Sequence, residues 1–122
     1  TILGIDSGSA IAALSDEAVE AYELPISQMN SSEPAMMSAL DSAYQNEQPI
    51  LVTLWSPHWA FANYDLKYLE DPENIYGDGD TIYWFSREGF SEDDPWLTAV
   101  LDAWHMSDDS LSELMAEIES QG

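Results

Sequence analysis

The stretch Thr1-Ile-Leu-Gly-Ile-Asp-Ser-Gly-Ser-Ala10 carries the pattern that decides the fold. The short apolar run 2–5 predicts a buried strand, and it stops at a polar turn rich in residues that cap helices. The apolar spacing after the turn predicts a helix over 10–22. Its apolar face is expected to consist of Ile11, Leu14, Ala18 and Ala21.

The same alternation continues along the chain. Residues 25–28 are predicted as a second short strand, and Ser32-Glu33-Pro34 as the start of another helix with proline in its first turn. Pro49-Ile-Leu-Val-Thr-Leu-Trp55 is typical of a third strand, apolar on both faces. This order indicates an open α/β sheet, which binds ligands at the carboxyl ends of its strands. The buried face of the second helix is expected to be Met36, Met37, Leu40 and Tyr44.

Beyond Trp59 the pattern is less regular. Residues 81–86 are predicted as a further strand, and two helices are expected at 94–104 and 108–120. Both helices start with carboxylates, which favour the positive end of a helix dipole. The acidic pairs Asp93/Asp94 and Asp108/Asp109 are therefore interpreted as exposed helix starts.

The composition excludes several classes of function. The 122 residues include 24 Asp and Glu but only 2 Lys and Arg, a formal net charge of −22. Binding to nucleic acid or to anionic lipid through basic residues is excluded, because both need clustered cations. There is no cysteine, no signal for a cofactor or metal, and no apolar run that could span a bilayer. The hydrophobic content of 45% still allows a core, and the length fits one domain.

Two segments at the predicted strand ends are candidate binding sites. Trp55-Ser-Pro-His-Trp59 could present an aromatic wall, since the indole face attracts a quaternary ammonium cation that cannot hydrogen-bond. The same rings could equally pack as ordinary core. The turn at Ser9, Ala10 and Ile11 opens a helix, where free backbone N–H groups suit a carboxylate or phosphate. Any capped helix offers such groups, so neither pattern alone defines a ligand.

Other functions stay open on these patterns. Trp55 and Trp59 could be stacking platforms of a carbohydrate-binding module. A hydrolase could use a pair of the many carboxylates. A serine hydrolase is not indicated, because no Gly-x-Ser-x-Gly nucleophile turn is present. A chain that acts chiefly through association is a third alternative.

Three ordered motifs resemble the glycine betaine/proline betaine substrate-binding proteins of ABC importers. Gly4-Ile-Asp-Ser-Gly-Ser-Ala-Ile11 is similar to their Gly-Ile-Asp-Pro-Gly-x-Gly-Ile turn, and Ser31-Ser-Glu-Pro-Ala-Met36 to their Ser-Ser-x-x-x-Met helix start. The segment from Pro49 to Pro72 matches the longest motif of the family almost residue for residue. Ser7 and Ala10 replace the usual Pro and Gly, but Ala10 keeps its N–H donor. The resemblance covers the whole chain and about half of a family protein.

The resemblance implies that residues 1–122 are one Rossmann-like lobe of a type II periplasmic-binding-protein clamshell, with a mixed or parallel sheet flanked by helices. Trp55 would be one wall of an aromatic cage around the quaternary ammonium of a betaine. The backbone N–H groups of Ala10 and Ile11 would hold its carboxylate, and Ser9, His58 and Trp59 would support the site. The other walls would come from the missing second lobe. The function implied is delivery of osmolytes to a membrane permease, without enzyme activity, and an isolated lobe could dimerise through its exposed cleft.

The implied location is extracytoplasmic, in the periplasm or at the cell surface, with attachment through a lipid anchor or the permease. The chain begins without Met, which suggests a mature segment or an excised domain. A zwitterion gains little from electrostatic steering, because its cation and carboxylate feel opposing forces. We therefore interpret the charge of −22 as a surface adaptation to high ionic strength, where salt relieves self-repulsion.

Overall fold

A computed structural model describes residues 1–122, with a three-stranded parallel sheet at its centre. β1 (Ile2–Gly4) lies between β2 (Gln28–Asn30) and β3 (Leu51–Val52). Ile2 is opposite Gln28 on one side and Leu51 on the other. The predicted α/β class is confirmed, and the sheet is parallel rather than mixed. Its strands therefore end at one common edge, which is where the candidate segments begin.

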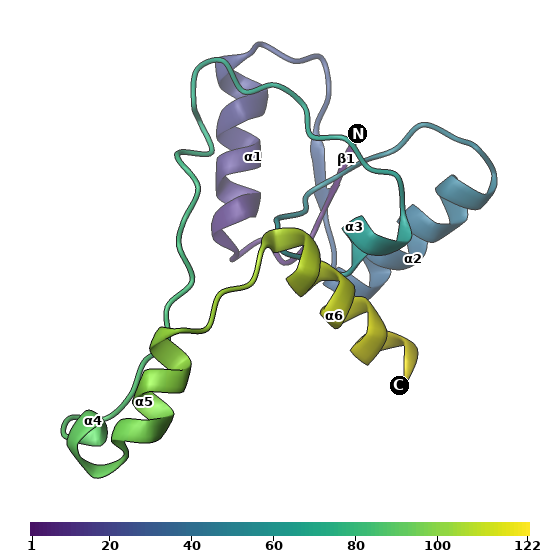
Figure 1. The fold of residues 1–122 in the computed structure, drawn as a ribbon. Helices are drawn as coiled ribbons and strands as arrows, with labels where there is room; N and C mark the ends of the chain where they lie inside the picture. The colour runs from purple at the N-terminus through teal and green to yellow at the C-terminus, as the bar shows by residue number, and fades with distance from the viewer.

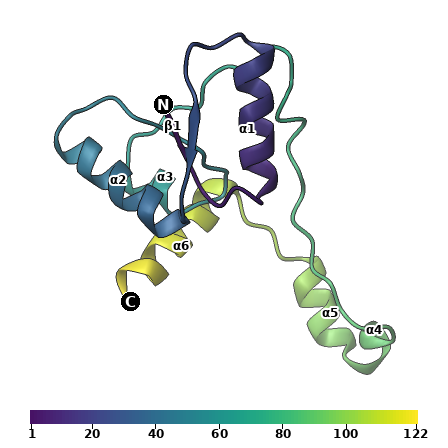
Figure 2. The same ribbon diagram turned by 180° about the vertical axis from the view of Figure 1, so that it is seen from behind.

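Helices flank the strands on two sides (Figures 1 and 2). α1 (Ala10–Ala21) lies on one side, and α2 (Glu33–Gln45) with the short α3 (Ala60–Asn63) on the other. Leu3 and Val52 from the sheet pack against the main core. Tyr44, which was expected on the buried face of α2, is exposed, although its ring meets that of Tyr64 at 5.1 Å. The buried members of the core are Met36, Met37, Leu40 and Ala60.

α1 approaches the sheet through small residues rather than through the large ones expected. The side-chain amide of Gln28 donates a hydrogen bond to the carbonyl oxygen of Ala12 at 2.9 Å, which small side chains on α1 permit. Ala21 is exposed, whereas Ile11 and Leu14 are half-buried. The residues buried on α1 are Ala12, Ser15 and Ala18. Of the predicted apolar face, only Ala18 is therefore correct.

A side-chain cap begins each of the four longest helices. The capping side chain accepts a hydrogen bond from the backbone N–H three residues later. α5 (Pro95–Asp102) and α6 (Asp108–Ser120) follow acidic or serine caps close to their predicted positions, although α5 ends before residue 104. α3 and the single-turn α4 (Phe90–Asp93) were not predicted. The four caps are Ser9, Ser32, Asp94 and Ser107.

The polypeptide leaves the packed part of the molecule and later returns to it. We call residues 77–104 the arm, and residues 1–76 with 105–122 the body. In Figures 1 and 2 the arm projects away from the sheet, and α4 and α5 at its far end pack against each other. α6 then returns to pack against α3. No helix in either part is both long and apolar enough to cross a membrane.

The predicted strands were less accurate than the predicted helices. The strand expected at 25–28 lies at Gln28–Asn30, and that expected over 49–55 is limited to Leu51–Val52. β1, the neighbour of both, is itself only 3 residues long and offers few pairing partners. Residues 81–86 form no strand, because their backbone has no neighbouring strand to bond.

Candidate functional site

The N-terminus of α1 presents two unpaired backbone donors. Ser9 has an extended backbone (φ −79°, ψ 150°), and its Oγ accepts a hydrogen bond from the N–H of Ala12 at 3.3 Å. The N–H groups of Ala10 and Ile11 make no hydrogen bond within the chain. Such free donors at the positive end of a helix dipole are suited to a carboxylate.

Trp55 follows β3 at the same edge of the sheet. Its side chain is 38% exposed, and its ring meets that of His58 at 5.1 Å with an interplanar angle of 85°. Trp55, Ala10 and Ile11 all line one cleft of about 2100 Å³. This volume exceeds the roughly 300–1,000 Å³ of a typical small-molecule pocket, so the cleft is wide open. The three residues that the resemblance assigns to ligand therefore lie along the same large cleft.

Hydrogen bonds anchor His58 in the loop that carries Trp55. It is only 2% exposed, and its backbone N–H donates to Ser112 Oγ at 3.2 Å. Its Nδ1 accepts the N–H of Ala60 at 3.1 Å, so Nε2 carries the ring proton and donates to Glu33 Oε1 at 3.2 Å. These bonds use both ring nitrogens, and His58 does not line the cleft. Its expected role in supporting the Trp55 loop stays a prediction.

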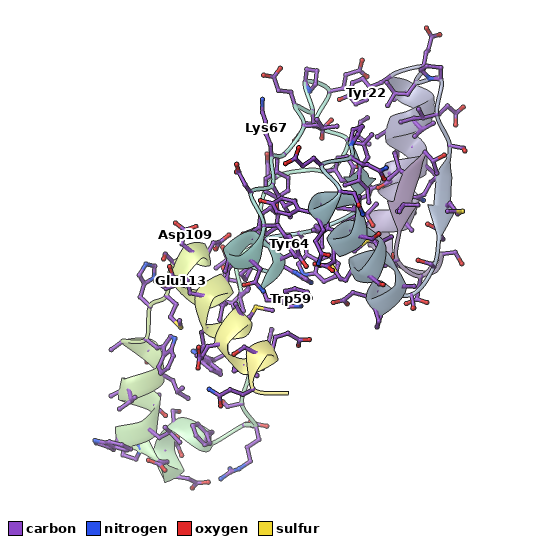
Figure 3. The ribbon with its side chains drawn as sticks, turned by 90° about the vertical axis from the view of Figure 1, so that its right-hand side faces the viewer. Tyr22, Trp59, Tyr64, Lys67, Asp109 and Glu113 are labelled. Carbon is purple, nitrogen blue, oxygen red and sulfur yellow. The ribbon has the colours of Figure 1, made fainter.

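Trp59 lies in a different depression from Trp55. Its ring is 5.4 Å from that of His58 and 6.4 Å from that of Tyr64, and Figure 3 shows Trp59 and Tyr64 beside α6. It lines a hollow of about 430 Å³ between α2 and the end of α6, whereas Trp55 lines the large cleft. The two indoles therefore do not form the common stacking platform that a carbohydrate-binding module would need.

One wall of the cleft depends on residues that the sequence did not single out. Tyr76 lines the cleft, and its hydroxyl donates to Ser15 Oγ at 3.0 Å. Ser15 is fully buried and donates in turn to the carbonyl oxygen of Ile11 at 2.7 Å. The partners are 61 residues apart, so no local spacing could have revealed them.

The same loop is attached to the far end of α1, where Figure 3 shows Tyr22. The Tyr22 hydroxyl donates to one carboxylate oxygen of Asp71, and the N–H of Tyr76 donates to the other at 2.8 Å. These bonds, chiefly the one from Tyr22, hold the pKa of Asp71 below its ordinary value. Desolvation and the Asp71 contact raise the pKa of Tyr22. The pair fixes the loop that precedes the arm.

Three of the four paired acids stand at helix starts, as predicted, whereas Asp93 is the last residue of α4. Asp94 caps α5, and Asp108 and Asp109 lie in the first turn of α6. Asp93 is ion-paired with Arg87. None of the His, Asp and Glu side chains gather in a group of three or more that could hold a metal. These four carboxylates thus have structural explanations in this fold.

Comparison with known proteins identifies relatives over the full chain. The family described as the substrate binding domain of ABC-type glycine betaine transport system matches residues 1–122. The chain is 40% identical over 121 residues to the glycine betaine/carnitine transport binding protein GbuC of Listeria monocytogenes serotype 1/2a (strain 10403S), covering 97% of this chain and 40% of that protein.

Two solved structures are also similar. Lactococcal OpuAC, in a closed-liganded conformation complexed with glycine betaine, matches with a TM-score of 0.76 and 32% identity, over 99% of this chain and 48% of that chain. The glycine/betaine/L-proline-binding protein ProX from Borrelia burgdorferi matches with a TM-score of 0.73 and 35% identity, over 98% of this chain and 46% of that chain.

The chain spans less than half the length of each of these proteins. The similarity to the two solved structures confirms the expected α/β fold of a periplasmic binding protein. The family comprises substrate-binding domains rather than enzymes, which agrees with the non-enzymatic interpretation. Because the match extends over all 122 residues, the chain belongs to the family of substrate-binding domains of ABC-type glycine betaine transport systems.

Proposed function

We propose that residues 1–122 form one substrate-binding lobe that captures glycine betaine, or a related quaternary ammonium osmolyte, for an ABC importer. The observation that carries the proposal is the cleft that Trp55 shares with the free N–H groups of Ala10 and Ile11. A betaine has a cation that cannot donate hydrogen bonds and a carboxylate that accepts them. An indole face suits the first group, and a helix N-terminus suits the second.

Binding proceeds without covalent chemistry. Trp55 provides one wall of an aromatic cage, the Ala10 and Ile11 N–H groups hold the carboxylate, and Ser9 fixes the helix start by capping it. His58 and Trp59 hold the loop that carries Trp55. A second lobe of the same protein supplies the remaining walls and closes over the ligand by a hinge motion.

The open cleft limits what this chain achieves alone. Cation–π contacts contribute about 0.5–1 kcal/mol at exposed sites and about 2 kcal/mol when water is excluded. We therefore expect the 122-residue chain to bind glycine betaine weakly or not at all. Calorimetry that gave micromolar affinity for this chain alone would contradict the proposed need for closure.

Substitution of Trp55 tests the cage in a polypeptide that contains both lobes. Trp55→Ala should weaken glycine betaine binding by about 10–30-fold, because a desolvated cation–π contact is lost. Trp96→Leu is the matched control, since Trp96 is 74% exposed and does not line the cleft, and it should change affinity less than about threefold. Binding of a neutral sugar that depended equally on Trp55 and Trp59 would instead support the carbohydrate-binding alternative.

Substitution of Ala10 tests the carboxylate site without breaking α1. Ala10 is the first helical residue, and Ser9 before it is extended, so proline fits there while removing one N–H donor. Ala10→Pro should weaken glycine betaine binding by about 10-fold or more. It should leave binding of tetramethylammonium, which has no carboxylate, unchanged. Ala10→Gly retains the donor and should bind normally; equal losses in both variants would refute the assignment.

The remaining partners follow from the same proposal. The loaded protein delivers its ligand to the membrane subunit of the permease, and it works on the extracytoplasmic side, in the periplasm or at the cell surface. Attachment there is through a lipid anchor or through the permease itself. Uptake of labelled glycine betaine by cells or vesicles that carry the permease should require this protein, and uptake that persisted in its absence would contradict the role.

A further inference from the structure

A chain of hydrogen bonds links one wall of the cleft to the first turn of α1. The Tyr76 hydroxyl lies 3.0 Å from Ser15 Oγ, which in turn lies 2.7 Å from the carbonyl oxygen of Ile11. A carbonyl oxygen can only accept, so the single proton of the serine hydroxyl is donated to Ile11. Ser15 therefore accepts the proton of Tyr76, and the chain runs in one direction, from the loop to the helix.

The middle member of this chain is a buried polar residue on a face of small side chains. Ser15 is fully buried, and the other residues buried on α1 are Ala12 and Ala18. A serine within a helix can place its proton on the carbonyl oxygen four residues earlier, as Ser15 does on Ile11. Its oxygen then still offers lone pairs, and a buried acceptor without a donor costs free energy. Tyr76 supplies that donor from outside the helix.

The carbonyl group at the end of the chain belongs to a residue of the candidate site. In an α-helix this oxygen also accepts the backbone N–H four residues later, so two donors of Ser15 fix its direction. Only two backbone torsions separate the carbonyl group of Ile11 from the free N–H of the same residue. Holding the carbonyl group in its helical orientation therefore limits the motion of the N–H groups at the helix start.

The first turn of α1 is thus held from two directions. On its N-terminal side, Ser9 accepts the N–H of Ala12 at its Oγ and that of Ala13 at its carbonyl oxygen, both at 3.3 Å. On the side of the loop, Tyr76 acts through Ser15. Helix ends otherwise fray. Donors that are ordered before the ligand arrives bind it with a smaller loss of entropy.

The loop that carries Tyr76 is itself attached to the far end of α1. The N–H of Tyr76 donates to Asp71, which also accepts the hydroxyl proton of Tyr22. The N–H of Glu73 donates to the Tyr22 hydroxyl at 2.9 Å. Figures 1 and 2 show the polypeptide passing beside α1 as it leaves this end of the helix. These bonds fix the backbone of Tyr76, so its hydroxyl reaches Ser15 from a fixed support.

We propose that Tyr76 is a positioning residue for the carboxylate half of the site and thereby sets its preference for zwitterionic ligands. Through Ser15 it holds the first turn of α1, so that the N–H groups of Ala10 and Ile11 stay arranged for a carboxylate. The role does not require Tyr76 to contact the ligand. This inference rests on the proposed function, because it concerns the ligand named there.

The cation half of the site is held by different contacts. The ring of Trp55 meets that of His58, and His58 Nε2 donates to Glu33 on α2. Neither Tyr76 nor Ser15 takes part in these contacts. Loss of the Tyr76 hydroxyl should therefore weaken binding of a ligand that has a carboxylate. It should leave binding of tetramethylammonium, which has none, unchanged.

The test compares these two kinds of ligand in the polypeptide that contains both lobes. Tyr76→Phe keeps the ring and removes only the hydroxyl, and it should weaken glycine betaine binding by about 3–10-fold. Its affinity for tetramethylammonium should change by less than about twofold. Equal losses for both ligands would show a merely structural role and overturn the inference. So would unchanged binding of glycine betaine.

Tyr64→Phe is the matched control. It also removes a tyrosine hydroxyl that donates a hydrogen bond to a residue distant in the sequence, here Asp41 at 3.1 Å, and Tyr64 does not line the cleft. Both affinities should change by less than about twofold in this variant. A loss specific to glycine betaine in the control as well would overturn the assignment to Tyr76.

Ser15→Ala interrupts the same chain at its middle member. It should cause a similar loss specific to glycine betaine. The double variant with Tyr76→Phe should lose no more than the weaker of the two single variants, because both changes break one chain of hydrogen bonds. Additive losses would mean that Tyr76 and Ser15 act separately, which contradicts the inference.

Hydrogen exchange in the 122-residue chain tests the positioning without ligand. Tyr76→Phe should raise the exchange rates of the amides of residues 13–15 by about 3–10-fold, and those of residues 18–21 by less than about twofold. Equal acceleration along α1, or none, would overturn the inference. Failure of the wild-type two-lobe protein to bind glycine betaine would instead contradict the proposed function. Normal binding by both the wild type and Tyr76→Phe would contradict only this inference.

Discussion

The body and the arm contain similar residues but differ in what covers them. In the body, Leu40 and Ala60 are fully buried, whereas in the arm Phe85 is 94% exposed. α5 is nevertheless a regular helix, because Asp94 caps it and Pro95 occupies its first turn. The difference shows that local signals suffice to form an element, whereas burial depends on a partner elsewhere in the protein.

Core truncation should produce the largest difference between the two regions. Leu40→Ala removes a fully buried side chain and should lower the free energy of unfolding of the 122-residue chain by about 2–5 kcal/mol. Ile82→Ala, in the arm, removes a side chain that is 71% exposed and should change it by less than about 0.5 kcal/mol. Urea unfolding measures both. Equal losses would mean that the arm is packed within this chain.

The second prediction concerns the contact through which α6, after the arm, attaches to the site. Ser112 is 4% exposed, and its Oγ accepts the His58 N–H. Ser112→Ala leaves this buried donor unpaired and should cost about 1–3 kcal/mol in urea unfolding. Ser38→Ala on α2 is the control, because Ser38 is exposed and makes no side-chain hydrogen bond. If both variants were neutral, α6 would not hold the loop of Trp55.

The elements of the body were predictable where apolar spacing and capping agree. The three motifs at residues 4–11, 31–36 and 49–72 located the strand ends, and Met36, Met37 and Leu40 are buried as expected. Trp55, Ala10 and Ile11 do share a cleft. Their contact with ligand remains a prediction, because it depends on the second lobe.

The errors have physical causes that a sequence does not display. Ser15 is buried because two hydrogen bonds satisfy its hydroxyl, and one of them comes from Tyr76, far along the chain. The hydrophobic pattern alone predicted that Ile11 and Leu14, rather than Ser15, lie on the buried face of α1. Residues 81–86 have the composition of a strand, but a strand needs a neighbour, and this chain provides none.

The third prediction concerns how salt changes the melting temperature, and which of the two regions carries the charges responsible. Of the 24 carboxylates, Asp93 is ion-paired with Arg87, and Glu33 accepts a hydrogen bond from His58 Nε2. The melting temperature should therefore rise by several degrees between about 0.1 and 1 M KCl, as the Debye length falls from about 10 to 3 Å. A flat response would contradict the proposed adaptation to high ionic strength.

Matched charge removal assigns this effect to a region. Neutralising three neighbouring carboxylates on α1 should reduce the salt response, since like charges three or four positions apart repel one another. Neutralising three in the arm should reduce it less, because the arm does not pack with the core that melts. The body variant is Asp16→Asn, Glu17→Gln, Glu20→Gln, and the arm variant is Glu88→Gln, Glu92→Gln, Asp102→Asn.

The smallest effect is expected at Asp71, which fixes the loop just before the arm. Its pKa is lowered from 3.8 in the folded protein, chiefly by the hydrogen bond from Tyr22. Its contribution to stability is therefore present above the unfolded pKa and is lost as pH falls through the folded one. The difference in melting temperature between the wild type and Asp71→Asn should be constant near pH 7 and shrink below about pH 4.

Asp78→Asn removes an equal charge at the start of the arm, where the carboxylate accepts no hydrogen bond. Relief of self-repulsion on acidification should affect both variants alike, so the pH dependence specific to Asp71→Asn isolates the bond to Tyr22. If Asp78→Asn showed the same dependence, the loop would be held by general electrostatics rather than by this contact. The boundary between body and arm would then lie before Asp71, since the attachment of this loop to α1 would no longer define it.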